Sequence, residues 1–428
     1  MKNIFVPGLT AVQREELESI AGSEEMRFHG LMDYDSLVKV TVVDFEKLLG
    51  EAREELGAFD GSVDAIIAHW DFPVSIIAPM LAAERGLPAP SLESLLKCEH
   101  KYWSRLEQLK SIPEVVPGFC AFDPFADDAL DEISLEYPFW IKPVKAHSSD
   151  LGFMITNEDE FWDALEEIRS EIENVGDAFE TVLERVDLPA ELEELGGNAC
   201  IAEQLVTGTQ FAPEGSVAGG EFAVHGVFHM RKDEAGTSFD RLSYPTADVP
   251  AEVQERAIDV SRRFLEHIGF DNGCFNSEFM WDEETGALSL IEFNTRISQS
   301  HSEMFLKVDG VSNHQVAVAV ALGRTPRMPD GKGEFDVAGQ YMIFHDEDAV
   351  VTRVPGPEEI AEVEKRHPGT VVTLEIAPGD RLSQLPGQDS YRYRLGKIYL
   401  GAGDHAEMDE KYARILDELD FGFDEEEQ

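Results

Sequence analysis

The sequence predicts a fold with α/β and α+β parts, arranged along the chain as three domains. Short apolar runs alternate with amphipathic stretches over residues 1–90, which is typical of a parallel α/β unit. Strand-like segments follow, interrupted by an acidic and helical excursion at 158–195. Prolines and glycines around residues 326–333 indicate a linker before a third set of short strands. The expected domains are an N-terminal α/β domain at 1–95, a central domain at 96–325 and a C-terminal α+β domain at 326–428.

The N-terminal elements follow from apolar runs and their stop signals. Residues 3–6 and 65–68 are short apolar segments of the kind that form buried strands. Residues 74–85 have a helical pattern that ends at Gly86, and Pro79 inside this pattern predicts a kink or a later start. A further helix is expected over 94–110.

The remaining elements alternate in the same way. We expect a clear amphipathic helix that ends at Gly269, a hairpin with its turn at 284–286, and an apolar helix that ends at Gly323. The expected strands are 137–144, 200–206, 221–230, 273–282, 287–298, 340–344, 370–375 and 397–400, and the expected helices are 251–268 and 312–322.

The composition is strongly acidic. The chain has 428 residues, with 85 acidic against 35 basic side chains and a formal net charge of -50. A field of this size repels nucleic acid and anionic lipid surfaces, so we expect neither as a partner. Because the acidic residues are dispersed, we expect a halophilic protein that stays soluble in concentrated salt. Four scattered cysteines, no signal-peptide pattern and no apolar run of membrane-spanning length favour the cytoplasm.

The segment 290–298 carries the strongest chemical signal. At the strand period of two, Ile291, Phe293, Thr295 and Ile297 should face one side, and Glu292, Asn294, Arg296 and Ser298 the other. Carboxylate and amide oxygens are ligands that Mg²⁺ prefers, and a guanidinium can hold an anionic phosphoryl or acyl group. Glu278 lies on the partner strand of the hairpin, where it could meet Glu292, and two such carboxylates repel unless cations lie between them. The alternative is an ordinary hairpin with a solvated polar face.

These residues resemble the metal-binding signature of ATP-grasp enzymes, over roughly residues 95–325. The resemblance implies the ATP-grasp fold, preceded by a Rossmann-like pre-ATP-grasp domain. It also implies that Glu278, Glu292 and Asn294 hold Mg²⁺ (or Mn²⁺) on the phosphates of ATP. Arg296 would be the catalytic residue that contacts the transferred phosphoryl group or the acyl phosphate. Residues 294–300 further resemble the carbamoyl phosphate synthetase branch.

The same resemblance implies a set of ATP-binding residues. Phosphate contacts would come from Lys101, from Lys142 at the end of an apolar strand, and from a flap containing Ser148 and Ser149. Adenine would be held by Glu203, Gln204, Leu205 and Val206, and the ribose by Gln210 or Glu214. The bland alternatives are exposed lysines, a surface loop and an ordinary buried strand.

The function implied is that of an ATP-dependent ligase, which activates a small-molecule carboxylate as an acyl phosphate and joins it to an amine. The alternatives are an enzyme acting on bicarbonate or carbamate, a kinase or nucleotidyl-forming variant, and an ATP-binding module without catalysis. A homodimer is an assembly that this reading leaves open. The sequence does not identify the substrates or the base that deprotonates the amine. His301 either faces the substrate or has a structural role.

Overall fold

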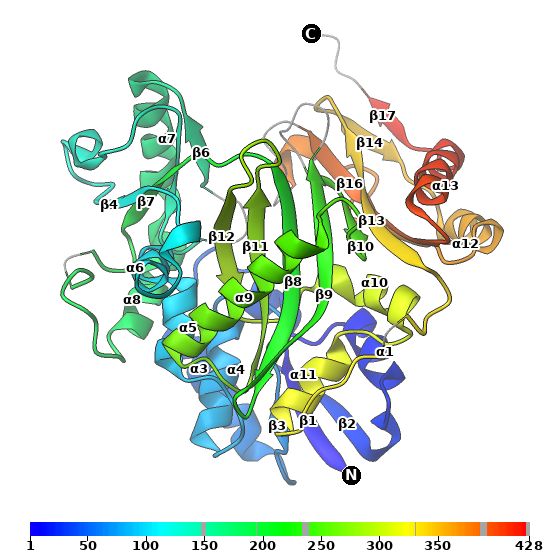
Figure 1. Ribbon diagram of the computed structural model, residues 1–428. Helices are drawn as coiled ribbons and strands as arrows, with labels where there is room; N and C mark the ends of the chain where they lie inside the picture. The colour runs from blue at the N-terminus through cyan, green and yellow to red at the C-terminus, as the bar shows by residue number, and fades with distance from the viewer. Residues whose placement is uncertain (147–150, 194, 233–238, 330, 386–391, 425–428) are drawn as a thin grey trace.

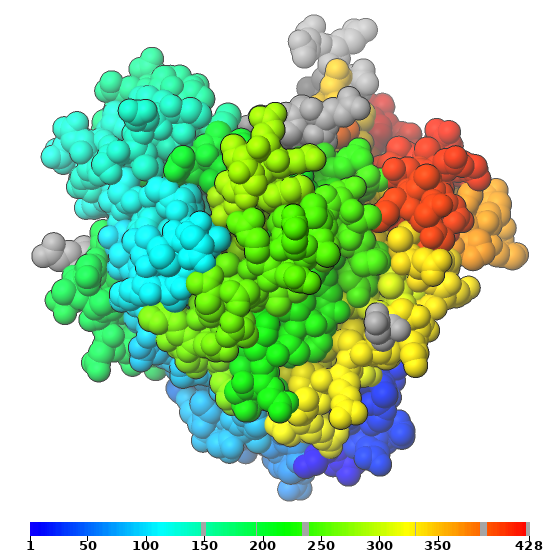
Figure 2. Space-filling view, viewed as in Figure 1, coloured from blue at the N-terminus to red at the C-terminus, as the bar shows by residue number. Residues whose placement is uncertain are grey.

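The computed structural model describes residues 1–428 except 147–150, 194, 233–238, 330, 386–391 and 425–428. An N-terminal α/β unit, a smaller four-stranded unit and a large antiparallel sheet make up the molecule (Figure 1). In the space-filling view the four-stranded unit (cyan and teal) lies on one side of the large sheet (green), and the C-terminal segment (orange and red) on the other (Figure 2). None of the helices in those ranges has the length and apolar character that crossing a bilayer requires.

The N-terminal unit contains a parallel sheet in the order β2-β1-β3, which confirms the predicted α/β arrangement. Its strands are β1 (Lys2–Pro7), β2 (Met26–Leu31) and β3 (Ala65–Ile66). Its helices are α1 (Ala11–Ser19), α2 (Tyr34–Val38), α3 (Phe45–Ala58) and α4 (Val74–Glu84). Pro79 lies inside α4, which begins before it at Val74, so the proposed later start was wrong.

The helix expected over 94–110 is two helices, α5 (Leu92–Glu99) and α6 (Lys101–Ser111). His100 between them has an extended backbone, and its Nδ1 accepts a hydrogen bond from the Trp103 amide at 3.2 Å. An N-cap of this kind satisfies one of the free amides in the first turn of a helix. Lys101 therefore begins α6, and its own amide donates to the Val144 carbonyl at 3.0 Å. The break places Lys101 beside the strand that carries Lys142.

The four-stranded sheet is antiparallel, in the order β4-β7-β5-β6. Its elements are β4 (Phe119–Phe122), β5 (Phe139–Pro143), β6 (Phe153–Ile155), α7 (Glu158–Glu171), α8 (Glu173–Leu183) and β7 (Cys200–Gln204). The predicted helical excursion is correct to Leu183, and the described residues between it and β7 form turns and irregular segments. Phe139 and Ile141 of β5 pack with Phe161 and Leu165 of α7 to form the core of this unit.

The large sheet has eight antiparallel strands in the order β12-β11-β8-β9-β10-β13-β16-β15. Its strands are β8 (Thr209–Ala218), β9 (Glu221–Lys232), β10 (Phe239–Tyr244), β11 (Gly273–Trp281), β12 (Leu288–Asn294), β13 (Val337–His345), β15 (Val371–Leu374) and β16 (Tyr393–Ala402). The helices that follow or interrupt it are α9 (Ala251–Ile268), α10 (Gln299–Asp309), α11 (His314–Ala321), α12 (Pro357–Arg366) and α13 (His405–Glu418). A separate pair, β14 (Val350–Arg353) and β17 (Gly422–Asp424), lies beside it.

Two observations bear on the division into domains. The large sheet continues across residue 326, because β10 pairs with β13. Residue 95 lies inside α5. The residues after 326 nevertheless have a core of their own, which includes Ile343, Leu395 and Ile415. We keep three domains as a proposal, with the first boundary better placed before α5.

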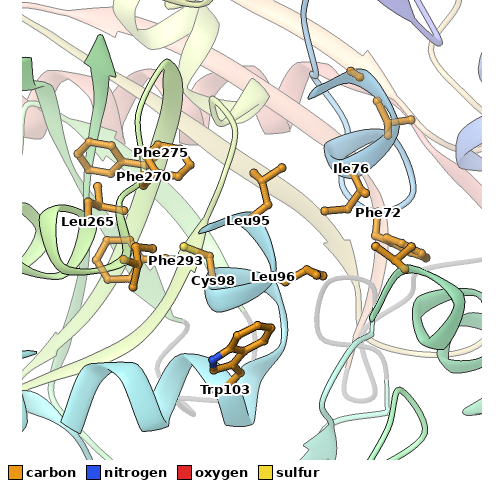
Figure 3. Packing of buried hydrophobic residues seen from close by; sticks show 14 of the residues in the cluster. Phe72, Ile76, Leu95, Leu96, Cys98, Trp103, Leu265, Phe270, Phe275 and Phe293 are labelled. Atoms are coloured by element: carbon orange, nitrogen blue, oxygen red, sulfur yellow. The ribbon is translucent and has the colours of Figure 1, made fainter. Parts of the chain in front are cut away.

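Two helices cover opposite faces of the large sheet. Successive strand residues point to opposite faces. Val227 packs in the cluster that contains Phe264 of α9, whereas Phe228 packs with Phe305 of α10. Figure 3 shows Phe275 and Phe293 of the sheet beside Leu265 of α9, and near Cys98 of α5.

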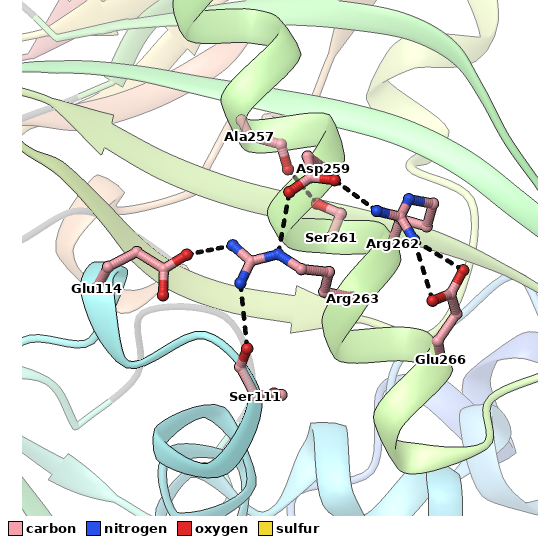
Figure 4. A network of polar contacts seen from close by, with 8 residues as sticks. All are labelled: Ser111, Glu114, Ala257, Asp259, Ser261, Arg262, Arg263 and Glu266. Carbon is pink, nitrogen blue, oxygen red and sulfur yellow. Dashed lines mark hydrogen bonds and ion pairs between the residues drawn. The ribbon is translucent and has the colours of Figure 1, made fainter.

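Polar contacts fasten α9 to the end of α6. Arg263 donates to the Ser111 carbonyl at 3.2 Å, pairs with Glu114, and also pairs with Asp259 of its own helix at 3.0 Å (Figure 4). These contacts hold the end of α6 against α9, which packs on the large sheet.

Candidate active site

The β11–β12 hairpin brings the two predicted metal-binding carboxylates together. Glu278 lies directly opposite Glu292 in the register, and Asn276 lies opposite Asn294. The prediction that Glu278 and Glu292 face each other across the hairpin is therefore confirmed. Residues directly opposite in an antiparallel pair have their Cβ atoms about 4.5–5.5 Å apart.

The face assignment along β12 needs one correction. A bulge between Glu278 and Phe279 leaves Ile291 without a register partner, because Phe279 pairs with Leu290. Leu290 is fully buried and Ile291 is half-buried, so Leu290 takes the core position that the alternation gave to Ile291. The strand also ends at Asn294, so the expectation that it extends to residue 298 was wrong.

The environment of Glu278 fits a bound cation. Burial, and the charge of Glu292 opposite, raise the pKa of Glu278 to about 8. Gln210 Nε2 donates to its Oε2 at 2.9 Å, and Asn294 Nδ2 donates to its Oε1 at 3.2 Å. Two carboxylates and one amide form a hard-oxygen donor set, which suits a metal that takes its other ligands from phosphate and water. Within the described ranges, no group of three or more His, Cys, Asp or Glu side chains could hold a metal. A metal bound by Glu278, Glu292 and Asn294 would therefore need further ligands from phosphate and water.

Arg296 is fixed by a partner that sequence reasoning missed. Its Nε and Nη2 donate to the two carboxylate oxygens of Asp71 at 2.7 and 2.9 Å. Burial opposes the charge, but Asp71 with Glu292 and Glu278 raises the pKa of Arg296 above its ordinary value. Asp71 follows β3. Its position just past the carboxyl end of a parallel strand is the feature of the sequence that could have indicated a site residue.

Glu203 is the centre of a buried ion-pair cluster. It pairs with Arg105 of α6 at 2.6 Å and with Lys142 of β5 at 2.7 Å. Burial opposes ionisation of the carboxyl, yet the two cations lower the pKa of Glu203 to about 2. Arg105 also donates to the Leu290 carbonyl at 2.8 Å, which links the cluster to β12. The fold thus brings the predicted residues Glu203 and Lys142 together. The sequence did not indicate that Glu203 would form ion pairs with Lys142 and Arg105.

Two further lysines lie near the carboxylate pair. Burial lowers the pKa of Lys101 to about 8, although the charge of Glu292 opposes this shift. Lys145 pairs with Glu99 at 2.7 Å, and Glu99 also accepts from the Thr295 hydroxyl at 2.9 Å. Neither Lys145 nor Glu99 was singled out from the sequence, because a lone lysine and a helix-end glutamate carry no pattern.

The other predicted nucleotide contacts are scattered more widely. Gln204 is exposed at the end of β7, and the half-buried Leu205 and Val206 follow it. Gln210 is bound to Glu278, whereas Glu214 is buried elsewhere in the sheet, among Ser298, His301 and Asn313. The predicted flap serines, Ser148 and Ser149, lie outside the described residues.

One cavity of about 270 Å³ is lined by five of the predicted site residues, Lys101, Glu278, Glu292, Asn294 and Arg296. Two of these residues are basic, two are acidic and one is an amide. The cavity is also lined by acidic, basic and histidine side chains that were not predicted as site residues. Its charged and hydrogen-bonding lining includes Asp71, Glu99, Lys101, Lys145, Asn276, Glu278, Glu292, Asn294, Thr295, Arg296, Ser298, Ser300 and His301. Its apolar lining includes Met230, Phe239 and Leu242. Such a cavity can neutralise phosphate groups on one wall and bind an uncharged portion of a small molecule on another.

Comparisons with known proteins relate the chain to a family of domains. Residues 135–303 match the family described as the ATP-grasp domain. Over 142 residues the chain is 26% identical to the carbamoyl phosphate synthase large chain of Thermotoga sp. (strain RQ2). That match covers 32% of this chain and 13% of the relative, so the chain spans about an eighth of that protein.

Solved structures resemble the whole fold. An L-amino acid ligase from Bacillus licheniformis superposes with a TM-score of 0.72 and 17% identity, covering 99% of both chains. A biotin carboxylase from Campylobacter jejuni superposes with a TM-score of 0.64 and 14% identity, covering 99% of this chain and 92% of that one. Residues 135–303 thus match the ATP-grasp domain, and the chain as a whole has the ATP-grasp fold.

Proposed function

Because the chain has the ATP-grasp fold, we propose that it is an ADP-forming ligase that joins a small-molecule carboxylate to an amine. The observation that carries the proposal is the pairing of Glu278 with Glu292, beside Asn294, on the wall of a cavity that also contains Arg296. The full-length fold similarity to an L-amino acid ligase supports the same reaction class.

We propose that Glu278, Glu292 and Asn294 hold Mg²⁺ or Mn²⁺ against the phosphates of ATP. The metal would supply charge neutralisation at the transferring γ-phosphoryl group. Lys101 lines the same cavity and would bind phosphate oxygens. Lys142 is paired with Glu203, and it would reach phosphate from that position.

Arg296 would act on the acyl phosphate and on the oxyanion that forms when the amine attacks it. Its bidentate pair with Asp71 holds the guanidinium in one orientation, so that little side-chain freedom is lost when the anion binds. Asp71 comes from the N-terminal unit, and this unit would therefore help to shape the substrate pocket.

The nucleotide base would lie along β7 and the residues that follow it, from Glu203 to Val206. Of the two candidates for the ribose we prefer Gln210, because it is next to Glu278 in the proposed metal site. Glu214 has both carboxylate oxygens engaged by buried donors.

A second candidate is an enzyme that uses bicarbonate or carbamate as its carboxylate. Its support is the 26% identity to carbamoyl phosphate synthase and the fold shared with a biotin carboxylase. Formation of ADP that depends on bicarbonate and needs no amino acid would favour this candidate.

A phosphate-release screen tests the proposal. The purified chain is incubated with Mg·ATP and pairs of amino acids in molar KCl, and phosphate, pyrophosphate and amide product are measured. We expect ADP, phosphate and an amide from at least one pair. Tight ATP binding without any phosphate release would instead indicate a binding module, and pyrophosphate release would indicate a nucleotidyl-forming enzyme.

A further inference from the structure

We propose that His301, held by Glu214, is the base that removes a proton from the attacking amine. This inference rests on the proposed ligase function and adds a catalytic residue to it. It is carried by the orientation of the imidazole in the cavity.

The imidazole of His301 is held on two sides. Its Nδ1 lies 2.7 Å from Glu214 Oε2, and its ring stacks on Phe228 with centroids 3.6 Å apart and an interplanar angle of 5°. The side chain is only 3% exposed. Ring position and ring plane are therefore both fixed before any substrate binds.

Glu214 is itself anchored. Its Oε2 also accepts from the Ser298 amide at 2.9 Å, and its Oε1 accepts from Asn313 Nδ2 at 2.7 Å. An ionised carboxylate accepts hydrogen bonds and donates none, so Nδ1 of His301 carries the proton. The lone pair is then on Nε2. A carboxylate that holds an imidazole in one tautomer is the arrangement that prepares histidine to accept a proton.

The free nitrogen is available to a substrate. No partner for Nε2 is found in the part of the chain that the structure describes. Nε2 is also not among the buried polar atoms that lack partners, and His301 lines the cavity that contains Arg296. The free nitrogen and the proposed acyl phosphate site thus share one cavity.

The surroundings of the ring contain few other charges. Glu214 is the one charged residue of β8 (Thr209–Ala218), and His225 of β9 is turned to the Ser216 hydroxyl at 2.9 Å. Tyr244 of β10 donates to Asp309 of α10 at 2.7 Å.

Among the cations of the same cavity, Arg296 is paired with Asp71 and Lys145 with Glu99. Glu278 and Glu292 line the same cavity and would face the metal. Glu214 is thus the group set to stabilise an imidazolium as it forms.

The proposed reaction joins a deprotonated amine to the carbon of the acyl phosphate. Nε2 of His301 takes one proton from the ammonium group of the substrate, and the neutral amine attacks the acyl phosphate carbon. The C–N bond forms, and the C–O bond to phosphate breaks with its electron pair going to the phosphate oxygen. The second nitrogen proton goes to the leaving phosphate, and the imidazolium returns its proton to solvent.

A comparison of two nucleophiles tests this role. Formation of the acyl phosphate needs no amine, and hydroxylamine is largely unprotonated at neutral pH, so trapping by hydroxylamine needs no base. We expect His301→Gln to lower amide formation, with the amino-acid pair found in the screen, by about 10². Hydroxamate formation from the same carboxylate should stay within a few-fold of wild type.

The ratio of the two rates is independent of the fraction of folded enzyme, so a partly misfolded preparation does not blur the result. His301→Asn provides a second variant with the same expected ratio. His267→Gln is the matched control, because it removes another carboxylate-bound imidazole, that of α9, which is paired with Glu107 of α6 at 2.8 Å. It should change neither rate.

A pH profile gives a second readout. In wild type, kcat/KM for the amine should fall on the acid side as an imidazole becomes protonated, and this limb should be absent in His301→Gln. Equal losses with both nucleophiles, or no loss with either, would overturn the base assignment while leaving the ligase function intact. If wild type forms neither amide nor hydroxamate with any carboxylate, the ligase function fails and this proposal fails with it.

Discussion

At the scale of single residues, the account depends on charges that the fold holds close together. Glu278 and Glu292 lie opposite each other in a buried hairpin, where two carboxylates repel unless a cation joins them. Burial and the charge of Glu292 raise the pKa of Glu278 to about 8, and a bound cation would relieve the repulsion between the two carboxylates.

Glu292→Gln removes one charged ligand at nearly constant volume. We expect turnover to fall by about 10²–10³ or more, because an electrostatic contact in the transition state is lost. The melting temperature without ATP should be unchanged or slightly raised, since the repulsion with Glu278 is relieved. Glu283→Gln in the exposed turn of the same hairpin is the control. Wild-type turnover of the Glu292 variant at saturating Mg²⁺ would rule out this metal site.

Arg296→Ala separates ground-state binding from transition-state binding. If Arg296 acts on the acyl phosphate, affinity for a non-hydrolysable Mg·ATP analogue should stay within a few-fold, while turnover falls by at least about 10². Calorimetry beside the phosphate assay measures both. A collapse of ATP affinity with unchanged turnover per bound ATP would make Arg296 a simple phosphate ligand.

At the scale of elements, the junction of α6, β5 and β7 is held by one buried carboxylate. Glu203 forms ion pairs with both Arg105 and Lys142, and Arg105 extends the contact to the backbone of β12. Breaking a buried ion pair on one side is costly because the remaining charge has no compensation.

Glu203→Gln should therefore lower the free energy of unfolding by about 3–5 kcal/mol, as measured by urea titration at constant salt. Glu136→Gln, an exposed position in the same unit, should have little effect. The pKa of Glu203 is depressed to about 2, so its stabilisation is present above its ordinary pKa of 4.5 and is lost as the pH falls toward 2. The difference between variant and wild type should shrink over that interval. A constant difference would mean that the ion pairs are not its source.

The sequence predicted elements well where periodicity is strong, and failed where side chains override it. The β11–β12 hairpin and α9 follow from alternation and from stop signals at Gly286 and Gly269. The break at His100 and the bulge at Ile291 depend on a side-chain cap and on register, which carry no periodic signal. Asp71 is 225 residues from Arg296 in the chain, and that distance hides the pair from any local pattern.

At the scale of the whole molecule, the net charge of -50 is the dominant property. We propose that the protein works in the cytoplasm of a salt-rich cell, where screening limits the mutual repulsion of its carboxylates. Many acidic side chains are already paired on the surface, as Asp259 and Glu266 are with Arg262 on α9 (Figure 4). The 85 acidic residues outnumber the 35 basic ones, so one-to-one pairing would leave 50 acidic side chains without a basic partner.

The melting temperature should consequently rise with KCl over the molar range. Sodium chloride at the same ionic strength should act similarly if screening is the cause, since screening depends on ionic strength. A melting temperature that does not depend on salt would remove the halophile proposal and leave the acidity without a physical role.

The central claim, activation of a carboxylate as an acyl phosphate, is tested most directly by following oxygen. The carboxylate substrate from the screen is labelled with ¹⁸O, and the released phosphate is examined by mass spectrometry. In-line attack of the carboxylate on the γ-phosphoryl group predicts one ¹⁸O atom in each inorganic phosphate formed. Unlabelled phosphate, or label in AMP instead, would contradict the account.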